Sequence, residues 1–408
     1  MSFYKRTMKD VPLDGKTVLM RGGYDLPLTS DGKVDDDYRI RMSLPTIKAL
    51  LERGCKVVII NHLGRPGGKV DLQYSLESAA ERLSELLGKE VIFVNDCVGE
   101  NARMTVKRAP AGSVIMFENL RFYPGEEAND PEFAKQVVKA SGAEYLVQDG
   151  FSDAHRAHAS MSAITHLLPS VAGLLIEREY TTITSAMKAP KRPLVAVLGG
   201  AKVSDKISVI EALVDVADTI IIGGAMANTF LARDGVFVGD SKVETDQNDT
   251  IDRIYEAVVR KVGRDKVNDF LILPIDVGVG TSTEPTATRQ DVSVRTIPAG
   301  SLALDIGPKS IERMQSVIAT AHTVIWNGTL GYAEVPAFAT GSAALAEQLA
   351  DNPAIDSIIG GGDTADFVIH WDKKHGESFS HVSTGGGASM ELMAGEKLPG
   401  IEALLDAR

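Results

Sequence analysis

The nine residues Leu194-Val195-Ala196-Val197-Leu198-Gly199-Gly200-Ala201-Lys202 carry the pattern on which the fold class rests. The first five are apolar and include two valines, which is typical of a strand buried inside a parallel sheet. Two glycines follow at once, and because glycine has no Cβ the backbone there can approach a ligand closely. A helical pattern resumes beyond Lys202. This order of strand, glycine turn and helix predicts an α/β protein that binds its ligand at the carboxyl end of a strand.

The same alternation extends in both directions. Helical periodicity runs from Tyr38 to Arg53, before Gly54, and from Ser75 to Leu87, before Gly88. Further short apolar runs predict strands at 57–60, 91–94, 114–117, 145–148, 219–222, 270–273, 323–326 and 357–359. Alternation of this kind predicts parallel sheets covered by helices on both faces, and 408 residues suffice for two such sheets.

The two sheets imply two domains, and we place their junction at 176–191. This stretch is charged and helix-prone and is closed by Pro190 and Pro193. An N-terminal domain would then span 1–175 and a C-terminal domain 192–389. The alternative is that 176–191 is simply another surface helix.

Composition narrows the class of protein. Forty-three basic and 55 acidic residues give a net charge of -12, which argues against bulk affinity for nucleic acid or anionic membranes. A mean hydropathy of -0.01 excludes a membrane-embedded chain. The two cysteines, Cys55 and Cys97, have no metal or disulfide spacing, and the N-terminus lacks an apolar signal-peptide core. We therefore expect a cytoplasmic protein.

Glycine runs dominate the second half of the chain. They are Gly199-Gly200, Gly223-Gly224, Gly360-Gly361-Gly362 and Gly385-Gly386-Gly387. Glycines before a helix let backbone NH groups cradle a phosphate, although close packing of strand on helix also uses glycine. Four runs in one half favour the phosphate ligand. Neither a P-loop nor a dinucleotide fingerprint is present, because Asp10 stands where the P-loop around Gly15-Lys16-Thr17 needs glycine.

Charged residues accompany these runs. Lys202 and Lys206 are four residues apart, a spacing that would place both on one helix face beside a transferring phosphoryl group; the alternative is a solvated pair. Asp363 follows three glycines and could hold Mg²⁺, or could only cap a helix. The first half contains a basic set that could bind a small phosphorylated acid: Arg21, Arg39, His62, Arg65, Arg121, His155, Arg156 and His158. Taken alone, each arginine would more often be a surface ion-pair partner.

Eight motifs, in order along nearly the whole chain, resemble the phosphoglycerate kinase family. They are His62-Leu-Gly-Arg65-Pro, Glu118-Asn-Leu-Arg121-Phe, Ala154-His-Arg156-Ala-His158-Ala-Ser, Leu198-Gly-Gly-Ala-Lys202-Val-Ser-Asp-Lys206, Leu304-Asp-Ile-Gly-Pro-Lys309, Val324-Ile-Trp-Asn327-Gly, Gly360-Gly-Gly-Asp363-Thr364 and Ser383-Thr-Gly-Gly-Gly-Ala-Ser389. The resemblance implies two Rossmann-like domains, with the segment 390–408 returning to the first. It also implies a monomer that transfers a phosphoryl group between 1,3-bisphosphoglycerate and ADP, giving 3-phosphoglycerate and ATP.

The resemblance further implies residue roles. In the N-terminal domain, the substrate site would comprise Asp25, Arg39, His62, Leu63, Gly64, Arg65, Arg121 and Arg156, with the phosphate on His62, Arg65, Arg121 and Arg156 and the transferring group at Arg39. In the C-terminal domain, the nucleotide site would comprise Gly200, Ala201, Lys202, Gly223, Gly224, Asn327, Glu334, Gly361, Gly362, Asp363 and Thr364. Lys202 would contact phosphates, Lys206 would stabilise the charge in transit, Glu334 would hold the ribose, Asp363 Mg²⁺ and Thr364 a phosphate.

The chain departs from this family at the glycerate end. Members usually have Arg-Val-Asp-Phe-Asn-Val-Pro, whereas this chain has Arg21-Gly22-Gly23-Tyr24-Asp25-Leu26-Pro27. Gln148-Asp149-Gly150-Phe151-Ser152-Asp153 likewise replaces Asn-Asp-Ala-Phe-Gly-Thr. An ionised Asp25 would repel a substrate carboxylate, so we expect weaker glycerate binding. Three functions stay open: an ordinary phosphoglycerate kinase, a kinase of another small phosphorylated acid, or a non-catalytic nucleotide-binding protein.

Overall fold

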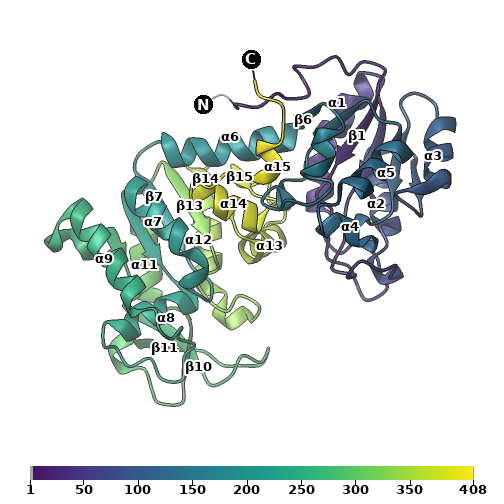
Figure 1. Ribbon diagram of the computed structural model, residues 1–408. Helices are drawn as coiled ribbons and strands as arrows, with labels where there is room; N and C mark the ends of the chain where they lie inside the picture. The colour runs from purple at the N-terminus through teal and green to yellow at the C-terminus, as the bar shows by residue number, and fades with distance from the viewer. Residues whose placement is uncertain (1–2, 408) are drawn as a thin grey trace. The chain divides into compact units, whose positions relative to one another are not determined.

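The computed structural model describes residues 3–407, which divide into two compact units. Unit 1 comprises the chain up to Thr181 together with the C-terminal segment that begins at Lys397, and unit 2 is Thr182–Glu396. The boundary at Thr181 falls inside helix α6 (Leu174–Lys188). Figure 1 shows the elements of each unit.

Unit 1 is built on a parallel sheet of six strands in the order β3-β4-β2-β1-β5-β6. The strands are β1 (Thr17–Arg21), β2 (Lys56–Ile60), β3 (Val91–Val94), β4 (Val114–Phe117), β5 (Tyr145–Gln148) and β6 (Ser170–Ala172). The helices are α1 (Tyr38–Glu52), α2 (Glu77–Leu87), α3 (Gly99–Arg108), α4 (Pro124–Glu127), α5 (Pro131–Ser141), α6 and α15 (Pro399–Glu402).

Alternating strand residues build two cores, one on each face of this sheet. Met20 belongs to a cluster with Ile47 of α1 and Leu83 of α2, whereas its neighbour Leu19 belongs to another with Val137 of α5. Because successive side chains of a strand point to opposite faces, each strand contributes to both layers. The expectation of helices on both faces is confirmed.

Unit 2 has a second parallel sheet of six strands, in the order β15-β14-β13-β7-β8-β9. They are β7 (Leu194–Leu198), β8 (Thr219–Ile222), β9 (Leu271–Ile272), β13 (Thr323–Asn327), β14 (Asp356–Gly360) and β15 (His381–Val382). The helices are α7 (Ile207–Val216), α8 (Gly224–Arg233), α9 (Asn248–Val262), α10 (Val267–Phe270), α11 (Pro308–Ile318), α12 (Thr340–Ala350), α13 (Gly362–Trp371) and α14 (Gly386–Met393).

Unit 2 also contains a small antiparallel sheet that the sequence did not predict. Its order is β11-β10-β12, with β10 at Asp276–Gly280, β11 at Gln290–Ser293 and β12 at Leu302–Ile306. β11 is polar and mostly exposed, so it lacks the apolar run by which the other strands are recognised.

The two ends of the chain pair with each other in unit 1. The amide of Arg6 donates to the carbonyl of Leu405 at 2.7 Å, and the amide of Ala407 donates to the carbonyl of Tyr4 at 2.9 Å. The Lys5 ammonium donates to the carbonyls of Glu402, at 2.8 Å, and Leu404, at 3.1 Å, which closes the end of α15.

Within residues 3–407 no helix has both the length and the apolar character that crossing a bilayer requires.

Candidate active site

Four neighbouring strands of unit 2 end at one edge, and a glycine follows each. In β13, Asn327 pairs in register with Leu198 of β7 on one side and Gly360 of β14 on the other, while Leu198 also pairs with Ile222 of β8. Parallel strands present their carboxyl ends together, so the runs that begin at 199, 223, 328 and 360 meet there. Residues far apart in sequence thus form one glycine-lined edge.

Several of these glycines are needed for close packing of the backbone. A Cβ on Gly199 would lie 2.1 Å from the carbonyl oxygen of Thr329, and one on Gly224 would lie 2.7 Å from the amide nitrogen of Gly200. Gly362 differs, because it is exposed and nothing within 4 Å would meet its Cβ. The packing explanation therefore accounts for Gly199 and Gly224, whereas Gly362 leaves the first turn of α13 open to a ligand.

Lys206 is held at this edge by Asn327. Its ammonium donates to the Asn327 main-chain carbonyl at 2.9 Å and to Oδ1 of the same residue at 2.5 Å. Burial lowers the pKa of Lys206 to about 8, against the opposing charges of Asp363 and Asp205. The Nδ2 group of Asn327 is buried and has no hydrogen-bond partner among the described residues. An unpaired buried donor of this kind is what an anionic ligand would satisfy.

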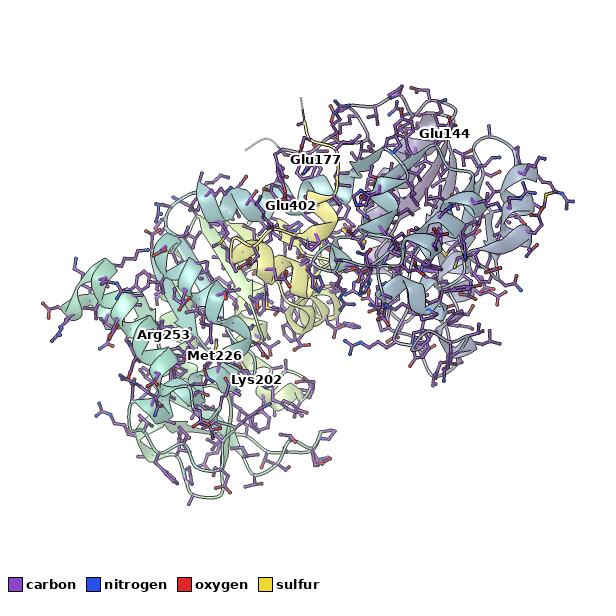
Figure 2. The ribbon with its side chains drawn as sticks, viewed as in Figure 1. Glu144, Glu177, Lys202, Met226, Arg253 and Glu402 are labelled. Atoms are coloured by element: carbon purple, nitrogen blue, oxygen red, sulfur yellow. The ribbon has the colours of Figure 1, made fainter. Side chains whose placement is uncertain are left out.

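The expectation that Lys202 and Lys206 share a helix face is wrong. Helix α7 begins only at Ile207, and Lys206 ends the 3₁₀ turn Ser204–Lys206 that precedes it. Gly200, at φ +92°, turns the chain before Lys202, which lies exposed in the loop. Figure 2 shows Lys202 in unit 2 near Met226 of α8, whose amide donates to the Gly200 carbonyl at 3.0 Å. The two lysines therefore occupy different environments: Lys202 is exposed, whereas Lys206 is partly buried and held by Asn327.

The other predicted nucleotide residues surround the same edge or extend from it. Asp363 is exposed in the first turn of α13, and Thr364 is buried, with its hydroxyl oxygen accepting from the Gly328 amide at 2.6 Å. Glu334 is exposed in the loop that follows β13, and Ala201 is exposed after β7. One exposed carboxylate beside the open Gly362 suits Mg²⁺, which usually takes its remaining ligands from phosphates and water. Among residues 3–407 no group of three or more His, Cys, Asp or Glu side chains could hold a metal alone.

In unit 1, the loop that follows β2 is held in place by Asn119, which belongs to the motif Glu118-Asn-Leu-Arg121-Phe. The Asn119 amide donates to the carbonyls of Leu63, at 2.7 Å, and Tyr74, at 2.9 Å, while its oxygen accepts from the Arg121 amide at 2.9 Å. Gly64 adopts φ +61°, and a Cβ there would lie 2.3 Å from the Tyr74 ring. Asn119 and Gly64 therefore position the His62 loop and Arg121 relative to each other.

The predicted arginines differ in how they are held. Arg121 is buried and donates to the Gly64 carbonyl at 2.8 Å, and burial lowers its pKa. Arg39, in the first turn of α1, donates to the carbonyl of Asp25. Arg156 is 33% exposed, and its Nη1 lies 3.7 Å from Asp153. Arg65 is exposed.

Asp25 lies among these groups as an ionised carboxylate. Its Oδ1 accepts from the Gly64 amide at 2.8 Å, and its Oδ2 lies 3.7 Å from Nε2 of His62. Burial acts to raise the pKa of Asp25, but the hydrogen bond and charge of His62, the Gly64 amide and Arg39 outweigh it and hold that pKa well below its usual range. Asp25, Gly64 and Leu63 also line a cavity of about 360 Å³.

Asp153 is a residue that the sequence did not place in the site. It is buried, and its Oδ2 accepts from Nη2 of Arg21 at 3.1 Å and lies 3.3 Å from Nδ1 of His62. Burial acts to raise the pKa of Asp153, but the charges of His62, Arg21, Arg156 and Arg121 hold it well below its usual range. The sequence feature that could have indicated such a residue is Arg21 at the end of a buried strand, because a buried arginine needs an acidic partner.

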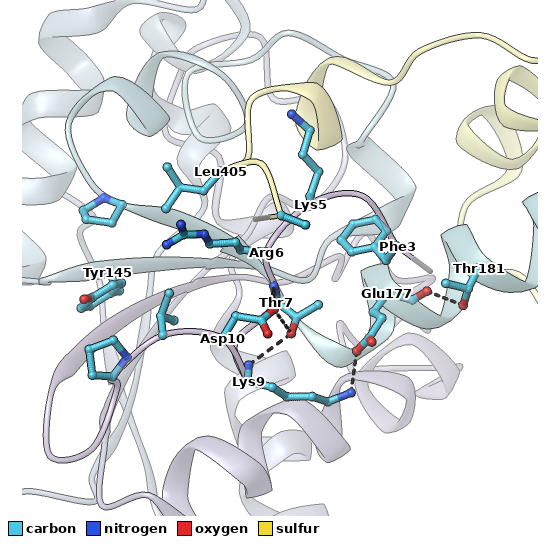
Figure 3. Close-up of a pocket in the computed structure, with 14 residues that line it drawn as sticks. Phe3, Lys5, Arg6, Thr7, Lys9, Asp10, Tyr145, Glu177, Thr181 and Leu405 are labelled. Atoms are coloured by element: carbon cyan, nitrogen blue, oxygen red, sulfur yellow. Dashed lines mark hydrogen bonds and ion pairs between the residues drawn. The ribbon is translucent and has the colours of Figure 1, made fainter. Parts of the chain in front are cut away.

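A larger cavity of about 810 Å³ lies where the two chain ends meet (Figure 3). Lys5, Arg6, Tyr145 and Leu405 line it, and Lys9 pairs with Glu177 at 2.7 Å at its rim. None of the predicted site residues is among its lining residues.

Comparisons with known proteins agree with this architecture. The family model described as phosphoglycerate kinase matches residues 8–396. The chain is 48% identical over 395 residues to the phosphoglycerate kinase of Trichodesmium erythraeum, covering 97% of this chain and 96% of that one. It is 45% identical over 405 residues to that of Pelotomaculum thermopropionicum, covering 98% and 99%.

Solved structures give the same result. The structure of phosphoglycerate kinase from Coxiella burnetii matches with a TM-score of 0.82 at 34% identity, covering 98% of both chains. That from Pyrococcus horikoshii matches with a TM-score of 0.82 at 30% identity, again covering 98% of both chains. The fold class predicted from the alternating strands and helices is thereby confirmed. The chain belongs to the phosphoglycerate kinase family.

Proposed function

We propose that the chain transfers a phosphoryl group between the acyl phosphate of 1,3-bisphosphoglycerate and ADP, giving 3-phosphoglycerate and ATP. The observation that carries the proposal is the arrangement at the strand edge of unit 2. There Lys206 is held by Asn327, whose buried amide group lacks a partner, and Asp363 stands exposed in the first turn of α13.

In unit 2, the nucleotide phosphates would bind at the glycine edge. The open first turn of α13 around Gly362 presents backbone NH groups and the positive end of the helix dipole. Lys202 is free to follow the phosphates because it is exposed, whereas the partly buried Lys206 is fixed by Asn327 and would meet the group in transit. Mg²⁺ held by Asp363 would offset phosphate charge. Phosphoryl transfer needs positioned positive charge more than covalent chemistry, and these groups provide it.

In unit 1, the small acid would bind among His62, Arg121 and Arg156, with the exposed Arg65 nearby in sequence. The buried Arg121 is fixed by Gly64, so it would orient the substrate phosphate, and the partly exposed Arg156 would complete the pairing. Arg39 would meet the transferring group from the first turn of α1. The reaction needs no general base from unit 1, because the acceptor, the carboxylate of 3-phosphoglycerate, is already ionised at neutral pH.

We further propose that 176–191 acts as a hinge between an acid-binding and a nucleotide-binding domain. Transfer requires the acceptor oxygen to approach the phosphorus of the donor group in line with the leaving oxygen, while the two proposed sites belong to different units. X-ray scattering should show a smaller radius of gyration when 3-phosphoglycerate and nucleotide are both present than with either alone. An unchanged radius would overturn the hinge.

The buried thiols of Cys55 and Cys97 are free, which supports a reducing compartment. We therefore propose that the protein is located in the cytoplasm. We also propose that it is a monomer.

A coupled assay with 3-phosphoglycerate and ATP tests the function. We expect turnover by the chain, and a loss of at least about a hundredfold in kcat for Lys206→Ala, with folding confirmed by circular dichroism. Turnover of another phosphorylated acid but not of 3-phosphoglycerate would redirect the substrate. Nucleotide binding without turnover of any such acid would mean a non-catalytic binding protein.

A further inference from the structure

We propose that Asp153 is a positioning residue that sets the charge of the acid-binding site and weakens its hold on the anionic substrate. The inference rests on the proposed function and refines it, because it concerns how tightly the same site binds 3-phosphoglycerate.

Asp153 contacts the buried Arg21 and two residues proposed to bind the substrate, His62 and Arg156. Its Oδ2 accepts from Arg21 at 3.1 Å and lies 3.3 Å from His62, while its Oδ1 lies 3.7 Å from Arg156. Arg21 and His62 are almost completely buried, so solvent screens this cluster little. One carboxylate therefore neutralises part of the positive charge on which the site depends.

This negative charge is permanent at physiological pH. The surrounding cations hold the pKa of Asp153 well below its usual range, although burial opposes them. A second anion that approaches Arg156 must therefore share the charge of this guanidinium with Asp153. Repulsion between two like charges in a site that solvent screens little changes a binding equilibrium by about tenfold or more.

Arg21 provides the matched opposite change. It is buried, and besides its contact with Asp153 its Nε donates a hydrogen bond to the Ser160 hydroxyl at 2.9 Å. Arg21→Gln removes one positive charge from the cluster, Asp153→Asn removes one negative charge, and the double variant leaves the net charge unchanged.

The test is the Michaelis constant for 3-phosphoglycerate in the unmodified chain and these three variants. We expect it to fall about tenfold in Asp153→Asn, rise about tenfold in Arg21→Gln and stay within about threefold in the double variant. The kcat and the Michaelis constant for ATP should change by less than about twofold. Glu144→Gln, which alters an exposed carboxylate paired with Lys16 in the same unit, is the control and should change nothing.

The outcomes separate the alternatives. If the unmodified chain does not turn over 3-phosphoglycerate, the proposed function fails. If it does, an unchanged or raised Michaelis constant in Asp153→Asn overturns this inference alone. A purely structural role would raise the constant and lower kcat in all three variants, and this too would overturn it. Should Asp153→Asn not fold, Arg21→Gln decides, because an unchanged or lowered constant there contradicts the charge argument.

Discussion

The Ser152 hydroxyl lies 2.8 Å from the position that a Cβ on Gly23 would occupy. This distance is shorter than a nonbonded contact allows, so Ser152 fills space that a side chain at position 23 would need. Gly150 and Gly22 are related in the same way, since a Cβ on Gly150 would lie 2.7 Å from the Gly22 carbonyl oxygen. The residues by which this chain differs from the family's usual motifs at 22–25 and 148–153 therefore pack against each other. Restoring the usual residue at one of these positions alone should produce a steric clash.

Gly23→Asp alone should destabilise unit 1 by about 1 to 3 kcal/mol, because the new side chain overpacks against Ser152. Gly23→Asp combined with Ser152→Gly should recover most of that loss. Urea unfolding followed by far-ultraviolet circular dichroism measures it, while the fluorescence of Trp326 and Trp371, both in unit 2, reports the other unit. Equal destabilisation of the single and double variants would contradict the coupling.

Deprotonation of Lys206 should make the reaction rate fall at alkaline pH. Burial lowers its pKa to about 8 from 10.5, so kcat should fall as pH rises through about 8 and the ammonium loses its proton. Between these two values the unfolded state binds more protons, so this residue makes stability rise with pH across that window. A pH–rate profile of the chain measures this fall. Lys206→Arg keeps its charge, so its profile should stay flat there, whatever its absolute rate.

Asp149 should make unit 1 more stable in mild acid. Its carboxylate is buried, its Oδ1 accepts from the Leu175 amide of α6 at 3.0 Å, and its Oδ2 has no partner among the described residues. Burial raises the pKa of Asp149 to about 7 from 3.8, so the folded state binds the extra proton and stability falls as pH rises through this window.

Asp149→Asn cannot ionise and should remove that dependence, worth roughly 2 to 4 kcal/mol between pH 4 and pH 8. Urea unfolding by circular dichroism at both pH values measures the difference. The same slope in the variant and the unmodified chain would assign the dependence to other groups.

Asn119→Ala should weaken binding of 3-phosphoglycerate by about tenfold or more, because the amide joins the His62 loop, Tyr74 and Arg121. Nucleotide affinity should not change. Calorimetric titration with each ligand measures both. Asn101→Ala, on the exposed surface of α3, is the matched control, and equal losses in the two variants would show that Asn119 has no special role.

The sequence predicts most of the two parallel sheets because buried strands carry their own signal. β3, β4, β5, β7 and β8 occupy the predicted residues, since each is apolar apart from Gln148 at the end of β5 and Thr219 at the start of β8. The sheet of β10, β11 and β12 was not predicted, because β11 is polar and exposed and β10 contains two glycines. Amphipathic periodicity also predicted α1 and α2 to within two residues.

Side-chain partnerships were harder to predict than strands. Arg21 and Asp153 are 132 residues apart in sequence, and nothing local to either predicts that they meet. The relation of Lys202 to Lys206 depended on where α7 begins, which is set by the turn at Gly200 and not by the four-residue spacing. The glycine runs predicted the edge itself, because parallel strands bring their carboxyl ends together.

The pairing of the chain ends has a consequence for synthesis on the ribosome. All residues of unit 2 have left the ribosome once Glu396 has been released from it. Unit 1 is complete only later, when Leu405 can accept its hydrogen bond from the Arg6 amide and Lys5 can bind the carbonyls at the end of α15. The first half to be translated is therefore the last to be finished. During that interval the nascent N-terminal strands lack these closing contacts, and unit 2 can fold ahead of unit 1, which precedes it in the chain.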